Sequence, residues 1–211
     1  MPFARRFALV GLAAVVQSLL YLWLNRAPLG VSHARTRTAL DAYVPFWPWS
    51  TWPYLLLLVL ELLLPLLVRQ RAEFRRLVVA YASALVVAVA IQGVWPTHRV
   101  RPELSLEPGP GALAYGVLVQ LDRPECSFPS IHVLVPLIAA WSLWRDRAWR
   151  WPLALVFALV PTVVTTAQHY LLDILGSIVL ACAAVALATR VVASGVDGRP
   201  TRSLDRGRSS R

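Results

Sequence analysis

The sequence predicts an all-α, polytopic membrane protein, a bundle of six transmembrane helices, and three observations support this prediction. First, 57% of the 211 residues are hydrophobic, more apolar surface than a soluble domain of this length can bury. Second, the apolar residues fall into long runs, and a membrane span needs about 20 such residues at 1.5 Å each. Third, arginines and tryptophans gather between these runs, as they do at membrane surfaces.

The apolar runs define six predicted spans in one domain. The first four are expected at residues 7–24, 53–68, 77–95 and 131–144. A further run, residues 151–189, would be about 58 Å long as one helix, close to twice the membrane thickness. We therefore expect it to fold back at the polar segment 165–169 and form two spans. Residues 1–193 then form the membrane domain, and the Arg- and Ser-rich residues 194–211 a basic, disordered cytoplasmic tail.

The distribution of basic residues predicts the orientation in the membrane. All 21 basic residues are arginines, and fifteen of them fall in segments on the side of the N-terminus. By the positive-inside rule, both termini of this multi-pass cell-membrane protein are expected in the cytoplasm. The net charge of +10 is then a property of membrane loops, so no nucleic-acid partner is expected.

The predicted topology brings two histidines together on the non-cytoplasmic side. His132 lies at the start of the fourth span, and His169 with Asp173 at the start of the sixth. On a helix, His169 and Asp173 would share one face. Asp173 could then accept the Nδ1 proton of His169 and leave Nε2 free as a nucleophile or base. His132 is expected to give a proton to a departing oxygen.

Basic and helix-capping residues on the same side suit a phosphate group. Arg99, Arg101 and Arg123 offer the charged, bidentate contacts that phosphate oxygens favour. Ser130 precedes an apolar helix and is expected as its N-cap, where free N–H groups bind phosphate. The combination predicts phosphoryl transfer through a covalent phosphohistidine.

Two further interpretations of the polar residues concern a zinc site and the role of Glu61. Zinc could bind His132, His169 and Asp173, but the sequence offers no further ligand cluster, so no metal or other cofactor is expected. Glu61 lies in the middle of the second span, where a buried carboxylate is a functional candidate because it is costly. A protonated structural group bonded to a neighbouring helix is an equal alternative, so Glu61 receives no role.

At these residues the chain resembles the type 2 phosphatidic acid phosphatase superfamily. Residues 128–132, Phe-Pro-Ser-Ile-His, resemble its Pro-Ser-x-His motif, and residues 169–176, His-Tyr-Leu-Leu-Asp-Ile-Leu-Gly, resemble its final His-x-x-x-Asp motif. Arg101-Pro102 resembles the Arg-Pro that closes the first motif. Residues 41–49 resemble the early loop of the inositol phosphorylceramide synthase-like branch, the branch that the chain resembles most.

The resemblance covers about residues 40–180 and implies a role for each site residue. It implies that His169 is the nucleophile, Asp173 its orienting partner and His132 the acid, with no metal required. The chain departs from the motifs at two cations: Val94 stands where the family has a lysine, and Thr162-Val163 where it has Ser-Arg. Arg99 and Arg123 are expected to substitute for them.

The sequence therefore predicts a metal-independent lipid phosphatase or lipid head-group phosphotransferase. Its substrate would be a membrane lipid phosphate or phospholipid, and the attack of water or of an alcohol on the phosphohistidine would separate the two activities. The main alternative is a non-catalytic membrane transporter or lipid-binding scaffold that keeps a degenerate site, which the missing cations favour. Metal-dependent hydrolysis is a third possibility.

Overall fold

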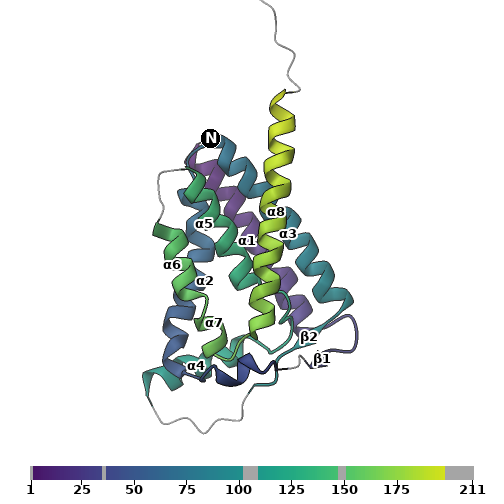
Figure 1. Ribbon diagram of the computed structural model, residues 1–211, viewed down its shortest axis with the longest axis vertical. Helices are drawn as coiled ribbons and strands as arrows, with labels where there is room; N and C mark the ends of the chain where they lie inside the picture. The colour runs from purple at the N-terminus through teal and green to yellow at the C-terminus, as the bar shows by residue number, and fades with distance from the viewer. Residues whose placement is uncertain (1, 35–36, 102–108, 147–150, 198–211) are drawn as a thin grey trace, which may run out of the picture.

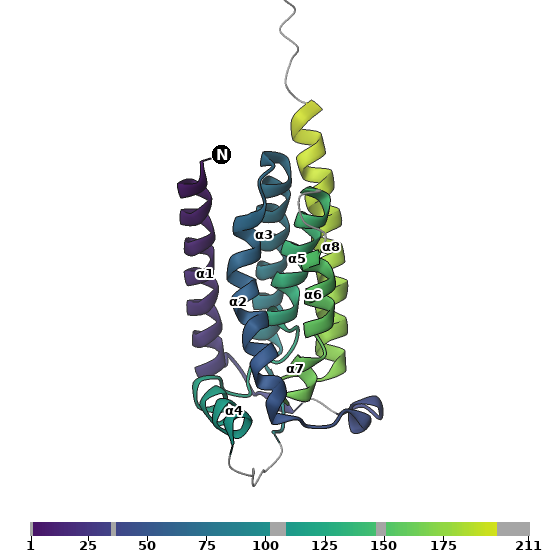
Figure 2. The same cartoon turned by 90° about the vertical axis from the view of Figure 1, so that its left-hand side faces the viewer.

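The structure, a computed structural model, describes residues 2–34, 37–101, 109–146 and 151–197. Within these residues the chain forms a bundle of helices with a single pair of short strands. The helices that run along the bundle axis (Figures 1 and 2) are α1 (Phe3–Arg26), α2 (Thr51–Leu67), α3 (Arg71–Val94), α5 (Ile131–Asp146), α6 (Trp151–Leu159) and α8 (Leu171–Asp197). Pro102 of the predicted first motif and residues 198–211 of the predicted tail lie outside the described residues.

The short elements gather at the end of the bundle opposite the two termini (Figures 1 and 2). They are the 3₁₀ helices η1 (Leu40–Tyr43) and η2 (Pro48–Ser50), the helices α4 (Pro110–Leu121) and α7 (Thr162–Thr165), and the parallel strands β1 (His33–Ala34) and β2 (Thr97–His98). In the sheet, His33 pairs with Thr97. The N-terminus and the end of α8 therefore lie at one end, and the loops that carry the predicted site lie at the other.

Four of the described helices are long and apolar enough to cross a membrane, at Phe3–Arg26, Pro48–Leu67, Arg71–Val94 and Leu171–Ser194. The predicted fourth span is the 16-residue helix α5, about 24 Å long and so shorter than the ~30 Å hydrocarbon core. The predicted fifth span is the shorter apolar run Trp151–Thr165. The all-α membrane class is confirmed by the four long helices, whereas the number of six spans stays a prediction.

Helix α5 lies in the centre of the bundle and α1 at its edge. Helix α5 contacts α2, α3, α6 and α8, and its buried residues face all sides of the helix, as expected for a helix that is apolar all round. Helix α1 packs against α2 and α3. Of its most apolar 18 residues, 6% are buried. Most apolar residues of α1 are therefore not buried against other helices, as expected at the edge of a bundle.

Helix α5 is short because the segment before it enters the bundle without helical structure. Non-helical backbone at such depth must find hydrogen-bond partners within the protein. Buried Gln92 of α3 donates to the carbonyl oxygens of Cys126 and Pro129 at 3.3 and 3.1 Å. The N–H of Ser127 donates to the carbonyl of Thr97, and the N–H of Phe128 to the Thr97 hydroxyl. Residues 126–129 thus form a fixed wall beside the predicted site.

The reversal predicted at residues 165–169 is confirmed. Helix α7 ends at Thr165 and α8 begins at Leu171, and the carbonyl of Val163 accepts the N–H groups of both Gln168 and His169. Ala167 adopts the left-handed conformation with φ of 54°. At its other end α8 continues to Asp197, past the predicted boundary at residue 193, because a single glycine costs a helix only about 1 kcal/mol.

Candidate active site

The imidazole of His169 is held by a backbone carbonyl. Its Nδ1 lies 2.8 Å from the carbonyl oxygen of Ser127, and the residue is buried. Because a carbonyl oxygen can only accept, Nδ1 carries the proton, and in the neutral ring Nε2 keeps its lone pair. His169 therefore presents the nitrogen that a nucleophile or base requires.

Asp173 is close to His169, but their geometry differs from the expected helical pair. His169 precedes α8, and Asp173 Oδ2 lies 3.6 Å from its Nδ1, longer than a hydrogen bond. The same oxygen accepts the N–H of Tyr170 at 2.9 Å. Tyr170 is the N-cap of α8 and Asp173 its third residue, so this contact is the return bond of a capping box. The carboxylate thus caps the helix and contributes negative charge beside the imidazole.

His132 in the first turn of α5 faces His169. Their ring centroids are 6.3 Å apart, and the rings of Tyr21 and Tyr54 meet His132 edge to face at 5.6 and 6.0 Å. Its Nδ1 lies 3.3 Å from Glu61 Oε2. The pairing leaves Nε2 of His132 as the nitrogen available to a substrate. The two histidines predicted to converge therefore do so.

Ser130 occupies the N-cap position of α5, but its hydroxyl makes no cap. Its carbonyl accepts the N–H groups of Val133 and Leu134, while its fully buried Oγ has no hydrogen-bond partner within the described residues. The hydroxyl of Ser177 on α8 also donates to the Ser130 carbonyl at 2.9 Å. The backbone is fixed, and the contact of the Ser130 hydroxyl with a ligand oxygen stays a prediction.

Two of the three predicted arginines lie against the turn that carries His169. Arg99 donates to the His169 carbonyl and lies over the Tyr170 ring at 4.5 Å. Burial lowers the pKa of Arg99, and neighbouring groups that include Tyr170 oppose this shift. Arg101 donates to Gln168 Oε1 at 2.7 Å and to the Asp122 carbonyl at 2.8 Å. Both guanidinium groups are therefore positioned mainly by uncharged acceptors.

The third arginine is placed differently. Arg123 is exposed, and Asn25 of α1 bonds its main-chain N–H and carbonyl. At the two positions where the resembled motifs carry cations, Val94 is 87% exposed and Val163 is fully buried. The turn uses the Val163 carbonyl rather than its side chain.

Three side chains around the site had no predicted role. Asp41 accepts the N–H of Leu171 at 2.8 Å and so caps α8 from the early loop. Burial opposes ionisation of Asp41, but hydrogen bonds from Thr38 and from that N–H lower its pKa. Gln168 holds Arg101, and Glu61 contacts His132. Glu61 carried a sequence signal as a charge within an apolar span, and Asp41 as the first residue of the segment 41–49.

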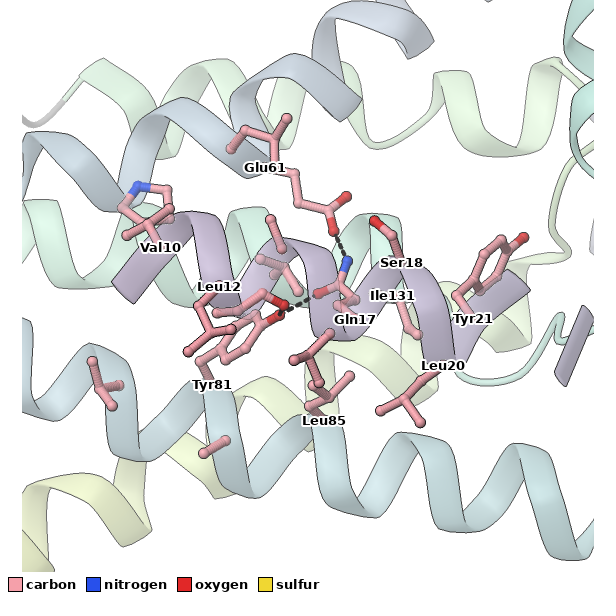
Figure 3. Close-up of a pocket in the computed structure, with 18 of the residues that line it drawn as sticks. Val10, Leu12, Gln17, Ser18, Leu20, Tyr21, Glu61, Tyr81, Leu85 and Ile131 are labelled. Atoms are coloured by element: carbon pink, nitrogen blue, oxygen red, sulfur yellow. Dashed lines mark hydrogen bonds between the residues drawn. The ribbon is translucent and has the colours of Figure 1, made fainter. Parts of the chain in front are cut away.

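A cavity of about 870 Å³ lies between α1 on one side and α2, α3 and the start of α5 on the other. Most of the residues that line it are apolar, and His132 and Glu61 form part of its wall. Figure 3 shows the labelled apolar side chains Val10, Leu12, Leu20 and Leu85 around this space. The volume lies within the ~300–1,000 Å³ typical of ligand pockets, and it connects His132 with the lipid-facing edge of the bundle.

The described residues contain no group of three or more His, Cys, Asp and Glu side chains arranged to hold a metal ion. The zinc alternative for His132, His169 and Asp173 would need ligands at about 2 Å from one ion. Nδ1 of each histidine faces an oxygen acceptor, Ser127 in one case and Glu61 in the other, so only the Nε2 atoms of the two rings would be free to bind an ion.

The fold and the site define a membrane-embedded helical protein with two facing histidines and two arginines at one end of the bundle. The family model of the PAP2 superfamily matches residues 22–187, and the chain belongs to this superfamily, whose members are generally phosphatases. No curated protein and no solved structure matches the chain. The likeness to the inositol phosphorylceramide synthase-like branch stays a prediction.

Proposed function

We propose that the protein is a metal-independent lipid phosphate phosphatase or phosphotransferase that forms a phosphohistidine at His169. The observation that carries this proposal is the pairing of His169 Nδ1 with the Ser127 carbonyl, beside a second histidine whose ring lies 6.3 Å away. One nitrogen is ready to attack phosphorus, and a second imidazole is close enough to serve the leaving oxygen.

The proposed reaction has two balanced steps. In the first, His169 Nε2 forms a bond to phosphorus while the bond to the lipid oxygen breaks, and His132 gives that oxygen its proton. In the second, water or an alcohol attacks the phosphohistidine, the P–N bond breaks, and His132 takes the proton of the attacking hydroxyl. Water yields free phosphate, and an alcohol yields a new phosphate ester.

Charge and shape support a lipid phosphate as substrate. Arg99 and Arg101 are held by the carbonyl and amide oxygens around His169, so their charges are available to the phosphoryl oxygens in the transition state. The main-chain N–H groups of Ile131 and His132, the first two of α5, offer further donors near the Ser130 hydroxyl, and Arg123 adds charge at the rim. The apolar cavity beside His132 suits a hydrocarbon chain, and we place the site at the non-cytoplasmic membrane surface.

The test is to trap the phosphoenzyme. Purified protein in detergent is mixed with ³²P-labelled phosphatidic acid and quenched, and radioactivity is followed on the protein, in free phosphate and in new lipid. We expect an acid-labile, alkali-stable label that His169→Ala removes and that EDTA leaves unchanged. Exposed His33 at the same end of the bundle gives the matched control, His33→Ala, which should keep the label.

Each result separates the alternatives. Release of free phosphate identifies a phosphatase, and label in a new lipid after addition of an alcohol acceptor identifies a transferase. A wild-type protein that neither becomes labelled nor turns over any of a panel of lipid phosphates and phospholipids would support the transporter or scaffold. Full turnover by His169→Ala would contradict the phosphohistidine, and loss of turnover in EDTA would support metal-dependent hydrolysis.

A further inference from the structure

Glu61 is a carboxylate at a place where the surrounding sequence is almost entirely leucine. It lies within Leu55–Leu67 of α2, and 8% of the residue is exposed. An ionisable side chain inside a membrane is costly unless it is paired, and a leucine here would pack at no such cost. The position of Glu61 therefore requires an explanation from its contacts.

The two oxygens of Glu61 have different partners. Oε1 accepts a hydrogen bond from the amide Nε2 of Gln17 on α1, and Oε2 faces Nδ1 of His132 at 3.3 Å. The amide oxygen of Gln17 in turn accepts the hydroxyl of Tyr81 on α3 at 2.7 Å. Figure 3 shows the part of this chain from Tyr81 through Gln17 to Glu61, which links α3 to α1 and α1 to α2.

The chain fixes the orientation of the carboxylate. Because an ionised carboxylate can only accept, the amide nitrogen of Gln17 faces Glu61 and the amide oxygen faces the Tyr81 hydroxyl, which also lies 3.2 Å from the Ala13 carbonyl. With Oε1 bound to that nitrogen, Oε2 is the oxygen left for His132. A structural link between α1 and α2 could be made by an amide at position 61. A carboxylate binds more strongly than an amide when its partner carries positive charge, as a proton-donating histidine does.

Both partners lie four residues before a proline. Pro65 follows Glu61 in α2, and Pro136 follows His132 in α5. Proline has no N–H, so neither main-chain carbonyl receives its helical hydrogen bond, and each helix is locally weakened at the contact. The hydrogen-bonded side chains from Tyr81 to His132 hold the two helices together in this region, where each backbone lacks one helical hydrogen bond.

We propose that Glu61 is a positioning residue for His132, held in place by Gln17 and Tyr81. This inference rests on the proposed function, because it assigns His132 the role of acid. With Nδ1–H of the imidazolium bonded to Glu61 Oε2, the second proton is on Nε2 and points away from the carboxylate. When the P–O bond breaks, Nε2 transfers this proton to the leaving oxygen. The ring is then neutral, and its remaining proton stays on Nδ1, hydrogen-bonded to Glu61.

The test compares leaving groups, since an acid matters only when the leaving oxygen is strongly basic. Wild type and Glu61→Gln are assayed with phosphatidic acid, which releases an alcohol, and with p-nitrophenyl phosphate, which releases a weakly basic phenolate. We expect Glu61→Gln to lower kcat about 100-fold on phosphatidic acid and less than about 3-fold on p-nitrophenyl phosphate, because general acid catalysis contributes about 10²–10⁴-fold.

Four further variants sharpen the test. His132→Ala should show the same selectivity, and adding Glu61→Gln to it should cause little further loss, because residues that act as a unit are not additive. Tyr81→Phe removes only the far end of the chain and should lower turnover of phosphatidic acid by a few-fold. Ser83→Ala removes a hydroxyl of α3 that donates to the Ala80 carbonyl of the same helix, away from the cavity lining, and should behave as wild type. An equal loss on both substrates in Glu61→Gln, or no loss on either, would overturn the proposal.

A measurement that needs no turnover separates this inference from the proposed function. In protein with ¹⁵N-labelled histidine, Glu61→Gln should shift the Nδ1 resonance of His132, assigned through His132→Ala, and leave that of His169 unchanged. If the wild-type protein is inactive but the shift is seen, the proposed function fails and the pairing stands. If the resonance does not move, the positioning role is wrong whatever the activity.

Discussion

The arginines at the two ends of the bundle have different partners. At the end that holds the termini, Glu73 forms ion pairs with both Arg76 and Arg145. At the opposite end, Arg99 is held by the His169 carbonyl and the Tyr170 ring, and the nearest carboxylate oxygen of Asp122 is 3.9 Å from Arg101. Carbonyl and amide oxygens orient a guanidinium without neutralising it. Glu73 therefore offsets part of the charge of its two arginine partners, whereas Arg99 has positive charge available for an anion.

The comparison also holds for the aspartates. At the end with the termini, Asp146 accepts the N–H groups of Arg69 and Gln70 at 2.7 and 3.3 Å, just before α3 begins. At the site end, Asp173 bonds the Tyr170 N–H and also lies 3.6 Å from His169. Both residues hold the main chain near a helix start, but only the second shares its carboxylate with a reactive side chain. Four variants test this contrast.

The largest effect is expected at Arg99. Arg99→Ala removes a charge oriented toward the site and should lower kcat/KM for a lipid phosphate by about 10²–10³-fold, the range for loss of one transition-state donor. Arg76→Ala removes a guanidinium of the other end and is the matched control, with activity expected within about 2-fold of wild type. Equal kinetic losses in the two variants would contradict the contrast between the ends.

A smaller effect is expected at Asp173. Asp173→Asn keeps an oxygen that can accept the Tyr170 N–H but removes the negative charge beside His169. Because the Ser127 carbonyl still fixes the Nδ1 proton, we expect a loss in kcat of about 10-fold, far below the ~10⁴-fold seen when a triad aspartate alone sets the tautomer. Single-turnover labelling of His169 measures the loss directly. A drop of 10⁴-fold would mean that the carboxylate, rather than the carbonyl, sets the tautomer.

At the other end, an aspartate should matter for stability alone. Asp146→Ala leaves two main-chain N–H groups without their acceptors, and we expect it to lower the free energy of unfolding by about 1–3 kcal/mol. The activity of the remaining folded protein should be unchanged. Thermal unfolding in detergent, followed with turnover per folded molecule, separates the two quantities. Reduced turnover per folded molecule would show that this end is coupled to the site.

The smallest effect is expected at Arg123, whose side chain is exposed. Arg123→Ala should change kcat/KM by less than about 2-fold at 0.15 M salt, because exposed charges are screened. Repeating the assay at low salt should enlarge the difference through slower association of an anionic substrate. A 100-fold loss at 0.15 M salt would place Arg123 with Arg99 in direct contact with the phosphate.

Much of the architecture could be predicted from residue patterns. Apolar runs located the long helices, and the polar segment 165–169 located the reversal before α8, since backbone in lipid must be helical or buried. The short helix α5 could not be predicted, because its length depends on Gln92 and Thr97 accommodating a non-helical segment inside the bundle. Hydropathy carries no information about such pairings.

The sequence by itself determined that the chain is a helical membrane protein and that His132 and His169 meet at one end of it. Only the tertiary structure decided what holds each ring. The Ser127 carbonyl lies 42 residues from His169, and Glu61 lies 71 residues from His132. A main-chain carbonyl is the same at every position, and a buried carboxylate does not reveal its partner. Such contacts are decided by how the helices pack, so they become visible only in the folded bundle.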